Sequence, residues 1–137
     1  MAAITVSRQL GSLGSDIARD VAARLGIRCV WKEPINQAAI RSGSPEVALA
    51  AMDELGLLGI CPSKKACGSY HQAVAEVINE LADAGSVVIV GRAGQAILGK
   101  RPDVLHVRIV APRKIRAERI AARRDLPLSG ALAQVKT

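Results

Sequence analysis

The feature that most constrains this chain is one stretch, Ile4 to Leu25, with the pattern of a strand, a tight turn and a helix. Ile4–Val6 is a short uncharged run rich in β-branched residues, which is typical of a buried parallel strand. The turn, Ser7–Ser15, contains two glycines. From Asp16 onward a helix is predicted, because apolar residues recur at helical spacing: Ile17, Ala18, Val21, Ala22 and Leu25.

This turn is a candidate phosphate-binding site. A turn that ends a strand and opens a helix directs unpaired N–H groups and the positive end of the helix dipole at one point in space. The P-loop pattern, G-x-x-x-x-G-K-[ST], adds a lysine for the β- and γ-phosphates, and this turn contains no lysine. The turn alone therefore leaves two interpretations open: an anion-binding turn, and an ordinary turn whose glycines only permit positive φ.

The composition limits the class of protein. With 137 residues, half of them hydrophobic, the chain is expected to form one domain over residues 1–137. Trp31 and Tyr70 are its only aromatic residues, which argues against nucleic-acid modules that stack bases on aromatic side chains. No apolar run approaches the roughly 20 residues of a membrane span, and the first strand follows Met1 too closely for a signal peptide.

We therefore expect a cytoplasmic protein that does not bind a membrane. The cysteines are odd in number and match neither a zinc spacing nor C-x-x-C, so they are expected to be reduced thiols: Cys29, Cys61 and Cys67.

The positive charge of the chain lies in one segment. The net charge is +7, and the residues up to Gly99 contain nine basic and nine acidic side chains. The segment from Lys100 to Arg124 contains nine basic residues and two acidic ones, which accounts for the whole excess of positive charge. Concentrated positive charge attracts an anionic partner such as a nucleotide, a nucleic acid or an acidic protein.

The rest of the chain alternates between strand and helix patterns. A crossover as short as the one after the first strand favours a parallel sheet. Val87–Val90 is the clearest buried strand, and it delivers Arg92 to the carboxyl end of the sheet, where open parallel sheets bind ligands. An alternative for Arg92 is a structural role at the strand end. The other predicted elements are a strand at Ile27–Trp31, a weak helix at Lys32–Gly43, a helix at Ser44–Leu58, a loop at Gly59–Gly68, a helix at Ser69–Ala84, a short helix at Ala93–Leu98, a strand at Val104–Val110 and a helix from Pro112.

The last predicted helix carries a row of arginines. Arg116, Arg119 and Arg123 are spaced i, i+3, i+7 and share one stripe of the helix. A guanidinium can hold a phosphate through two hydrogen bonds, and only Glu118 within the helix offers an opposite charge. The row favours an anion site, the alternative being a solvated surface helix.

Three segments together resemble the cytidylate kinase-like family, a branch of the P-loop nucleoside monophosphate kinases. They occur in the family's order and span most of the chain: Ile4–Ser12 with the helix after it, Val88–Gly94, and Arg101–Val107 running into Ala111–Arg119. The resemblance implies a three-layer α/β fold, with about four parallel strands and helices on both faces. It also implies phosphoryl transfer from ATP to a nucleoside monophosphate, CMP or dCMP, with Mg²⁺.

The resemblance implies a role for each part of the site. The turn would hold the donor nucleotide, and the lid-like basic segment at about 112–125 would close over the transferring group, with Arg116 and Arg119 as its catalytic residues. Arg92 would contact the acceptor phosphate. The residues expected to bind ATP are Arg8, Gly11, Ser12, Gly14, Ser15 and Asp16.

Several positions depart from the classical pattern. The lysine position falls on Gly14, and Leu13 stands where glycine is usual. Asp16 occupies the position of the hydroxyl that binds the metal, so its carboxylate is the candidate Mg²⁺ ligand. Arg8 and Arg19 are the two candidates to replace the lysine.

Relatives of this kind continue beyond the lid helix through a further helix and a last strand, so the C-terminal end of the fold is expected to be missing. An uncovered strand edge would result, and a homo-oligomer is one way to cover it. Two alternatives to the kinase remain open: a non-catalytic module that binds an anionic ligand or partner through the basic segment, and, less favoured, a nucleic-acid binder that contacts backbone phosphates.

Overall fold

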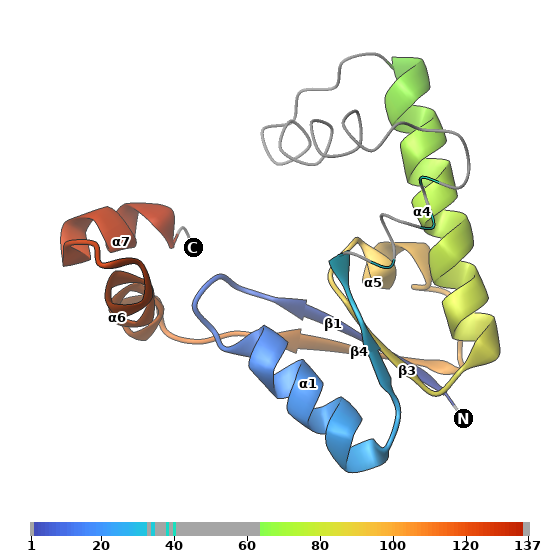
Figure 1. Ribbon diagram of the computed structural model, residues 1–137, viewed down its shortest axis with the longest axis horizontal. Helices are drawn as coiled ribbons and strands as arrows, with labels where there is room; N and C mark the ends of the chain where they lie inside the picture. Colours follow the sequence, from blue (N-terminus) through green and yellow to red (C-terminus); the bar gives the residue numbers. More distant parts are fainter. Residues whose placement is uncertain (1, 33, 35–37, 39, 41–63, 136–137) are drawn as a thin grey trace.

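A computed structural model of the protein describes residues 2–32, 34, 38, 40 and 64–135 (Figure 1). Its centre is a parallel sheet with the strand order β2-β3-β1-β4. The strands are β1 (Ala3–Arg8), β2 (Arg28–Val30), β3 (Val87–Val90) and β4 (Val104–Ile109). The predicted α/β fold, with a parallel sheet of about four strands, is confirmed.

Helices cover both faces of this sheet. The helix α1 (Gly14–Leu25) packs its Ala18 and Ala22 against alternate β-strand residues, among them Val88 and Val90. On the opposite face, α4 (Lys64–Ala84) and the short α5 (Gly94–Ile97) cover the other set, which includes Val87 and Ile89. Figure 1 shows α1 and α4 on opposite sides of the sheet. Because β3 is buried on both faces, its run of four apolar residues is explained.

A separate pair of helices follows β4. These are α6 (Arg113–Arg124) and α7 (Leu128–Gln134), each preceded by a proline, and α7 was not predicted from the sequence. They share a small core of their own, made of Ala117, Ile120, Ala131 and Val135. The pair lies beyond the carboxyl ends of β1 and β4 (Figure 1). The basic segment is therefore held at the edge of the sheet where parallel strands bind ligands.

The element boundaries follow local chemistry. Gly26 ends α1 in the left-handed conformation, with φ of 65°, as expected of a glycine after a helix. The loop predicted at Gly59–Gly68 is wrong from Lys64 onward, because α4 already begins there. Lysine and alanine are good helix formers, and one interior glycine costs only about 1 kcal/mol. The predicted helices at Lys32–Gly43 and Ser44–Leu58 fall largely outside the described residues.

Two further findings concern predictions made from composition. Cys29 is a free, half-buried thiol, and burial raises its pKa, with a smaller opposing effect from the charge of Arg19. In the part of the chain that the structure describes, no helix is long and apolar enough to cross a membrane.

Candidate functional site

The turn between β1 and α1 has the geometry of an anion-binding turn. Gly11 and Leu13 both have positive φ, 80° and 64°, and the buried Ser12 hydroxyl accepts a hydrogen bond from the N–H of Gly14 at 3.3 Å. The N–H groups of Ser15 and Asp16 are in the first turn of α1, so they have no acceptor within the helix. Both residues line a cavity of about 270 Å³, whose lining is Arg8, Gln9, Leu10, Gly11, Leu13, Gly14, Ser15, Asp16 and Arg123.

The neighbouring turn, between β3 and α5, is strained. Gly91, Arg92 and Ala93 are consecutive residues in the left-handed region, with φ of 71°, 54° and 56°. Each non-glycine residue held there costs of the order of 1 kcal/mol, and such strain is concentrated at functional sites. The N–H of Gly91 donates to the carbonyl of Val6 at 2.9 Å, so this turn is fixed beside the end of β1.

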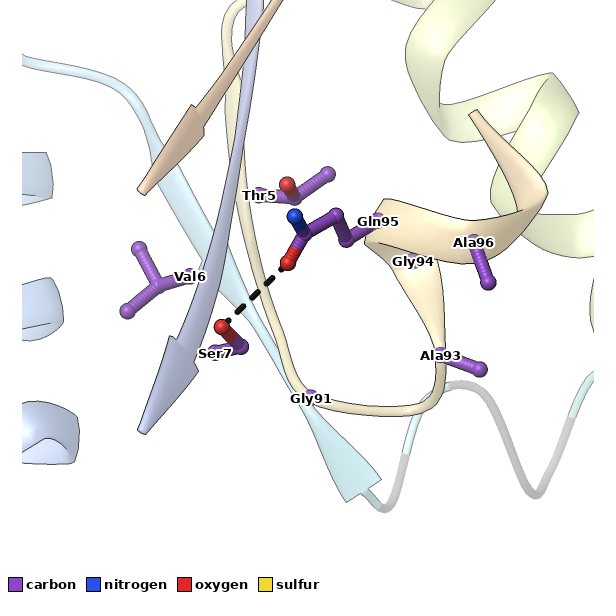
Figure 2. A pocket seen from close by; sticks show the side chains of 8 residues that line it. All are labelled: Thr5, Val6, Ser7, Gly91, Ala93, Gly94, Gln95 and Ala96. Atoms are coloured by element: carbon purple, nitrogen blue, oxygen red, sulfur yellow. Dashed lines mark hydrogen bonds between the residues drawn. The ribbon is translucent and has the colours of Figure 1, made fainter. Parts of the chain in front are cut away.

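A second cavity, of about 460 Å³, lies between β1 and the β3–α5 turn (Figure 2). Figure 2 shows Ser7 and Gln95 pointing toward each other across it, joined by a hydrogen bond of 3.4 Å. Thr5 lies on the same face of β1, whereas Val6 points to the opposite face. The sequence analysis missed these polar residues. Their signal was the alternation of Thr5 and Ser7 with the apolar residues Ile4 and Val6, which places both on one face of the strand.

Arg116 is buried, with 3% of its surface exposed. Its guanidinium donates to the carbonyl of Ala111 at 2.9 Å and, more weakly, to that of Leu10 at 3.4 Å. A methyl group added to Gly11 would lie 2.7 Å from the carbonyl oxygen of Arg116, so helix and turn are in direct backbone contact. The solvated surface helix, the alternative for this stripe, does not describe Arg116.

The other two arginines of the stripe reach the same turn. Arg119 is half-buried and donates to the carbonyl of Gly11 at 3.1 Å. Arg123 lines the smaller cavity, and its guanidinium lies 4.0 Å from the carboxylate of Asp16. The stripe thus approaches the turn along its length, with its buried end holding backbone carbonyls and its exposed end bordering the cavity.

The predicted site residues fall into two groups. Arg8, Gly11, Gly14, Ser15 and Asp16 line one cavity, beneath which Ser12 is buried. Arg92, half-buried, lies on the adjacent strained turn, and Arg116 with Arg119 contacts the turn from α6. The predicted site residues therefore lie at one edge of the sheet, and they come from three parts of the chain that are far apart in the sequence.

Asp16 is the one carboxylate among the residues that line the smaller cavity. It is half exposed and is held by Arg19 at 2.6 Å. Among the described residues, no group of three His, Cys, Asp or Glu side chains surrounds it. Mg²⁺ in kinase sites is commonly held by one or two carboxylates plus the phosphates of the substrate, so a single carboxylate at this position fits a metal that arrives with a nucleotide.

A parallel sheet with helices on both faces and a glycine-bearing turn between its first strand and first helix defines the class of P-loop kinase folds. Solved structures with this fold match almost the whole chain. An uncharacterized protein from Eubacterium ventriosum is 21% identical, with a TM-score of 0.69 over 98% of this chain and 69% of that one. A gluconokinase from Sinorhizobium meliloti is 20% identical, with a TM-score of 0.55 over 98% and 72%. Shikimate kinase from Acinetobacter baumannii is 14% identical, with a TM-score of 0.54 over 98% and 74%.

Within this class, the chain belongs to the cytidylate kinase-like family, which it matches over residues 3–137. The resemblance drawn from the three sequence segments is confirmed. A search of curated proteins gives no match. Membership of this family supports a nucleotide-binding phosphotransferase.

Proposed function

We propose that the protein transfers the γ-phosphoryl group of ATP to a nucleoside monophosphate, with CMP or dCMP as the acceptor. One observation carries the proposal. The structure has one cavity at the β1–α1 turn and another between β1 and the strained β3–α5 turn, and the consecutive residues Ser7 and Arg8 line one each. We propose the first cavity as the donor site and the second as the acceptor site, with arginines contributed by β1, the β3–α5 turn and α6.

In this proposal the transfer is an in-line displacement. An oxygen of the acceptor phosphate forms a bond to the γ-phosphorus while the bond from that phosphorus to the β–γ bridging oxygen breaks, and ADP leaves with the electron pair. The acceptor oxygen carries no proton, so a general base is not needed. The protein has to align the two phosphates and balance their charge, which arginines and backbone N–H groups do well.

The proposed roles follow from position. The N–H groups of Ser15 and Asp16 hold phosphate oxygens of ATP, and Arg92 holds the acceptor phosphate from the neighbouring turn. Arg119 reaches the transferring group by exchanging its hydrogen bond with Gly11 for one with phosphate. Arg116 keeps its carbonyl partners and positions the helix, so of the two arginines we propose Arg119 as the one that touches the γ-phosphoryl group.

Mg²⁺ bound with ATP would neutralise charge on the β- and γ-phosphates. Asp16 is the residue that would hold it, giving up its ion pair with Arg19. Arg19 has a second partner to retain it, because its guanidinium lies 5.0 Å above the centre of the Trp31 ring.

A non-catalytic module is the second candidate, and a specific observation favours it. Leu13 occupies a left-handed position in the phosphate-binding turn, where its side chain lines the cavity. A bulky apolar group there reduces the space for an anion. The basic α6 would then serve to bind an anionic partner.

The test is ADP formation measured with a panel of acceptors. Mg²⁺-ATP is incubated with CMP, dCMP, AMP, gluconate or shikimate, and ADP is followed by chromatography. The proposal expects ADP only with a pyrimidine nucleoside monophosphate, in an amount equal to the diphosphate formed. ADP formation with gluconate or shikimate alone would replace the proposed acceptor, and ATP binding with no transfer to any acceptor would favour the non-catalytic module.

A further inference from the structure

The position of the missing P-loop lysine falls on Gly14, and the atoms around Gly14 indicate which residue takes the role of the lysine. Gly14 is the first residue of α1 and is buried. A methyl group added there would overlap Cβ of Arg8, and it would lie 2.9 Å from Cγ of Arg8 and 3.2 Å from the Ser12 hydroxyl. The space that a side chain needs at position 14 is therefore already filled by the stem of Arg8.

From Gly14 the Arg8 side chain runs along the edge of the sheet. Its Nε donates to the hydroxyl of Ser15 at 3.0 Å. Its Nη1 comes so close to Gly91 that a methyl group there would lie 2.8 Å away. Gly91 also has φ of 71°. Glycine adopts this conformation without strain, and its lack of a Cβ leaves room for the guanidinium of Arg8.

The Arg8 side chain therefore extends from the smaller cavity toward the larger one. Arg8 lines the smaller cavity at the β1–α1 turn, and Gly91, which it approaches, lines the larger one. A phosphoryl group that passes from a donor in the first to an acceptor in the second has to cross this boundary. Among the residues that the structure describes, the two terminal nitrogens of Arg8 have no hydrogen-bond partner. They are available to an anion.

Arg19, the other candidate to replace the lysine, makes its contacts with other residues. Its guanidinium is bound to Asp16 at 2.6 Å and stacks over Trp31, and more than half of its side chain is exposed. The atoms nearest to a methyl group added at Gly14 or at Gly91 include none from Arg19.

We propose that Arg8 replaces the P-loop lysine. Its guanidinium binds the β- and γ-phosphate oxygens of the donor nucleotide, reaching them from strand β1 rather than from helix α1. The hydrogen bond to Ser15 fixes Nε, so the terminal nitrogens form a preorganised fork that can hold two phosphate oxygens, which an ammonium cannot do. This inference rests on the proposed function, because it needs a nucleotide in the turn.

The first test compares the affinities of the full chain and its variants for ATP and AMP by calorimetric titration. Arg8→Met is expected to bind ATP about 10- to 100-fold more weakly, the effect of losing charged hydrogen bonds, and AMP with little change. The control is Arg19→Met, which is expected to keep the preference of the natural chain for ATP. If Arg8→Met keeps that preference too, the inference is overturned while the proposed function stands. Failure of the natural chain to bind ATP overturns both.

A second test moves the positive charge from position 8 on strand β1 to position 14 on helix α1. With Arg8 in place, Gly14→Lys is expected to destabilise the protein, because Cβ of the lysine overlaps Cβ of Arg8. In an Arg8→Gly background that obstacle is removed, so adding Gly14→Lys is expected to raise ATP affinity at least tenfold over Arg8→Gly alone. Circular dichroism shows which variants are folded. If the folded double variant binds ATP no better than Arg8→Gly, the two positions do not share one phosphate site and the inference is wrong.

Discussion

The guanidinium of Arg119 donates a hydrogen bond to the carbonyl of Gly11 at 3.1 Å, joining the basic helix α6 to the β1–α1 turn across 108 residues of sequence. This hydrogen bond holds the positively charged guanidinium of Arg119 beside the cavity proposed for the donor phosphates. The bond is to a neutral carbonyl, and a phosphate is a stronger acceptor for the same guanidinium.

Replacement of Arg119 by alanine tests this role. We expect Arg119→Ala to lower the rate of phosphoryl transfer by about 10³-fold, as a transition-state arginine does, with the fold intact. The measurement is the rate of ADP formation with saturating acceptor. The control is Lys114→Ala, an exposed change on the same helix that should leave the rate unchanged. An Arg119→Ala rate equal to that of the natural chain would remove Arg119 from the site.

Arg116 is expected to affect stability. Arg116→Met removes the donor from the carbonyls of Ala111 and Leu10 at a buried position. We expect the free energy of unfolding to fall by about 1 kcal/mol, because two partly buried carbonyls lose a charged hydrogen-bond donor. Urea denaturation measures this, with Lys114→Met as the exposed control. A loss of activity at unchanged stability would show instead that Arg116 acts directly on the substrate.

Leu13 holds a backbone conformation that suits glycine. Leu13→Gly is expected to raise the free energy of unfolding by about 1 kcal/mol, because the left-handed strain at φ of 64° is relieved. It should also strengthen ATP binding by clearing the cavity. Leu10→Gly, at an exposed leucine in the same turn without positive φ, should not stabilise the protein. A destabilised Leu13→Gly protein would mean that the packing of the leucine outweighs the strain.

A pH dependence is expected at the start of β4. The Arg101 guanidinium bonds Asp103 and Asp83, and the hydrogen bond from Arg101 holds the pKa of Asp103 below its usual value. A carboxyl whose pKa is lower in the folded state contributes stability above its unfolded pKa, about 4, and loses it as the pH falls through the folded value. Melting temperatures between pH 7 and pH 2 should therefore fall less steeply at the acid end for Asp103→Asn than for the natural chain.

The control for this effect is Asp20→Asn, at an exposed carboxylate that pairs with Arg24 on α1. Its acid profile should follow that of the natural chain. Identical profiles for all three proteins would show that the Arg101 cluster does not contribute to acid unfolding.

The central strand β3 was predictable because its four residues are all apolar and all buried. Val87–Val90 was therefore the clearest strand in the sequence, and the helices on either side of the sheet, α1 and α4, are each followed by a glycine with positive φ, Gly26 and Gly85. The short helix α7 was missed, because its seven residues form a stable element only by packing against Ala117 and Ile120 of α6. Such a helix draws its stability from tertiary contact, which local sequence does not show.

The candidate site was predictable in its parts but not in its geometry. Spacing placed Arg116, Arg119 and Arg123 on one stripe, yet it could not show that Arg116 is buried against backbone carbonyls. Likewise, the absence of a lysine was plain in the sequence, whereas the overlap of the Arg8 stem with position 14 depends on how β1 enters the turn. Long-range contacts of this kind are set by the assembled fold.

The measurement that tests the central claim most directly is calorimetric titration of the folded chain with ATP and CMP, separately and together, with and without Mg²⁺. We predict saturable binding of each nucleotide at its own site, and ADP formation only when CMP, Mg²⁺ and ATP are all present. The absence of ATP binding in a sample shown to be folded would contradict the account.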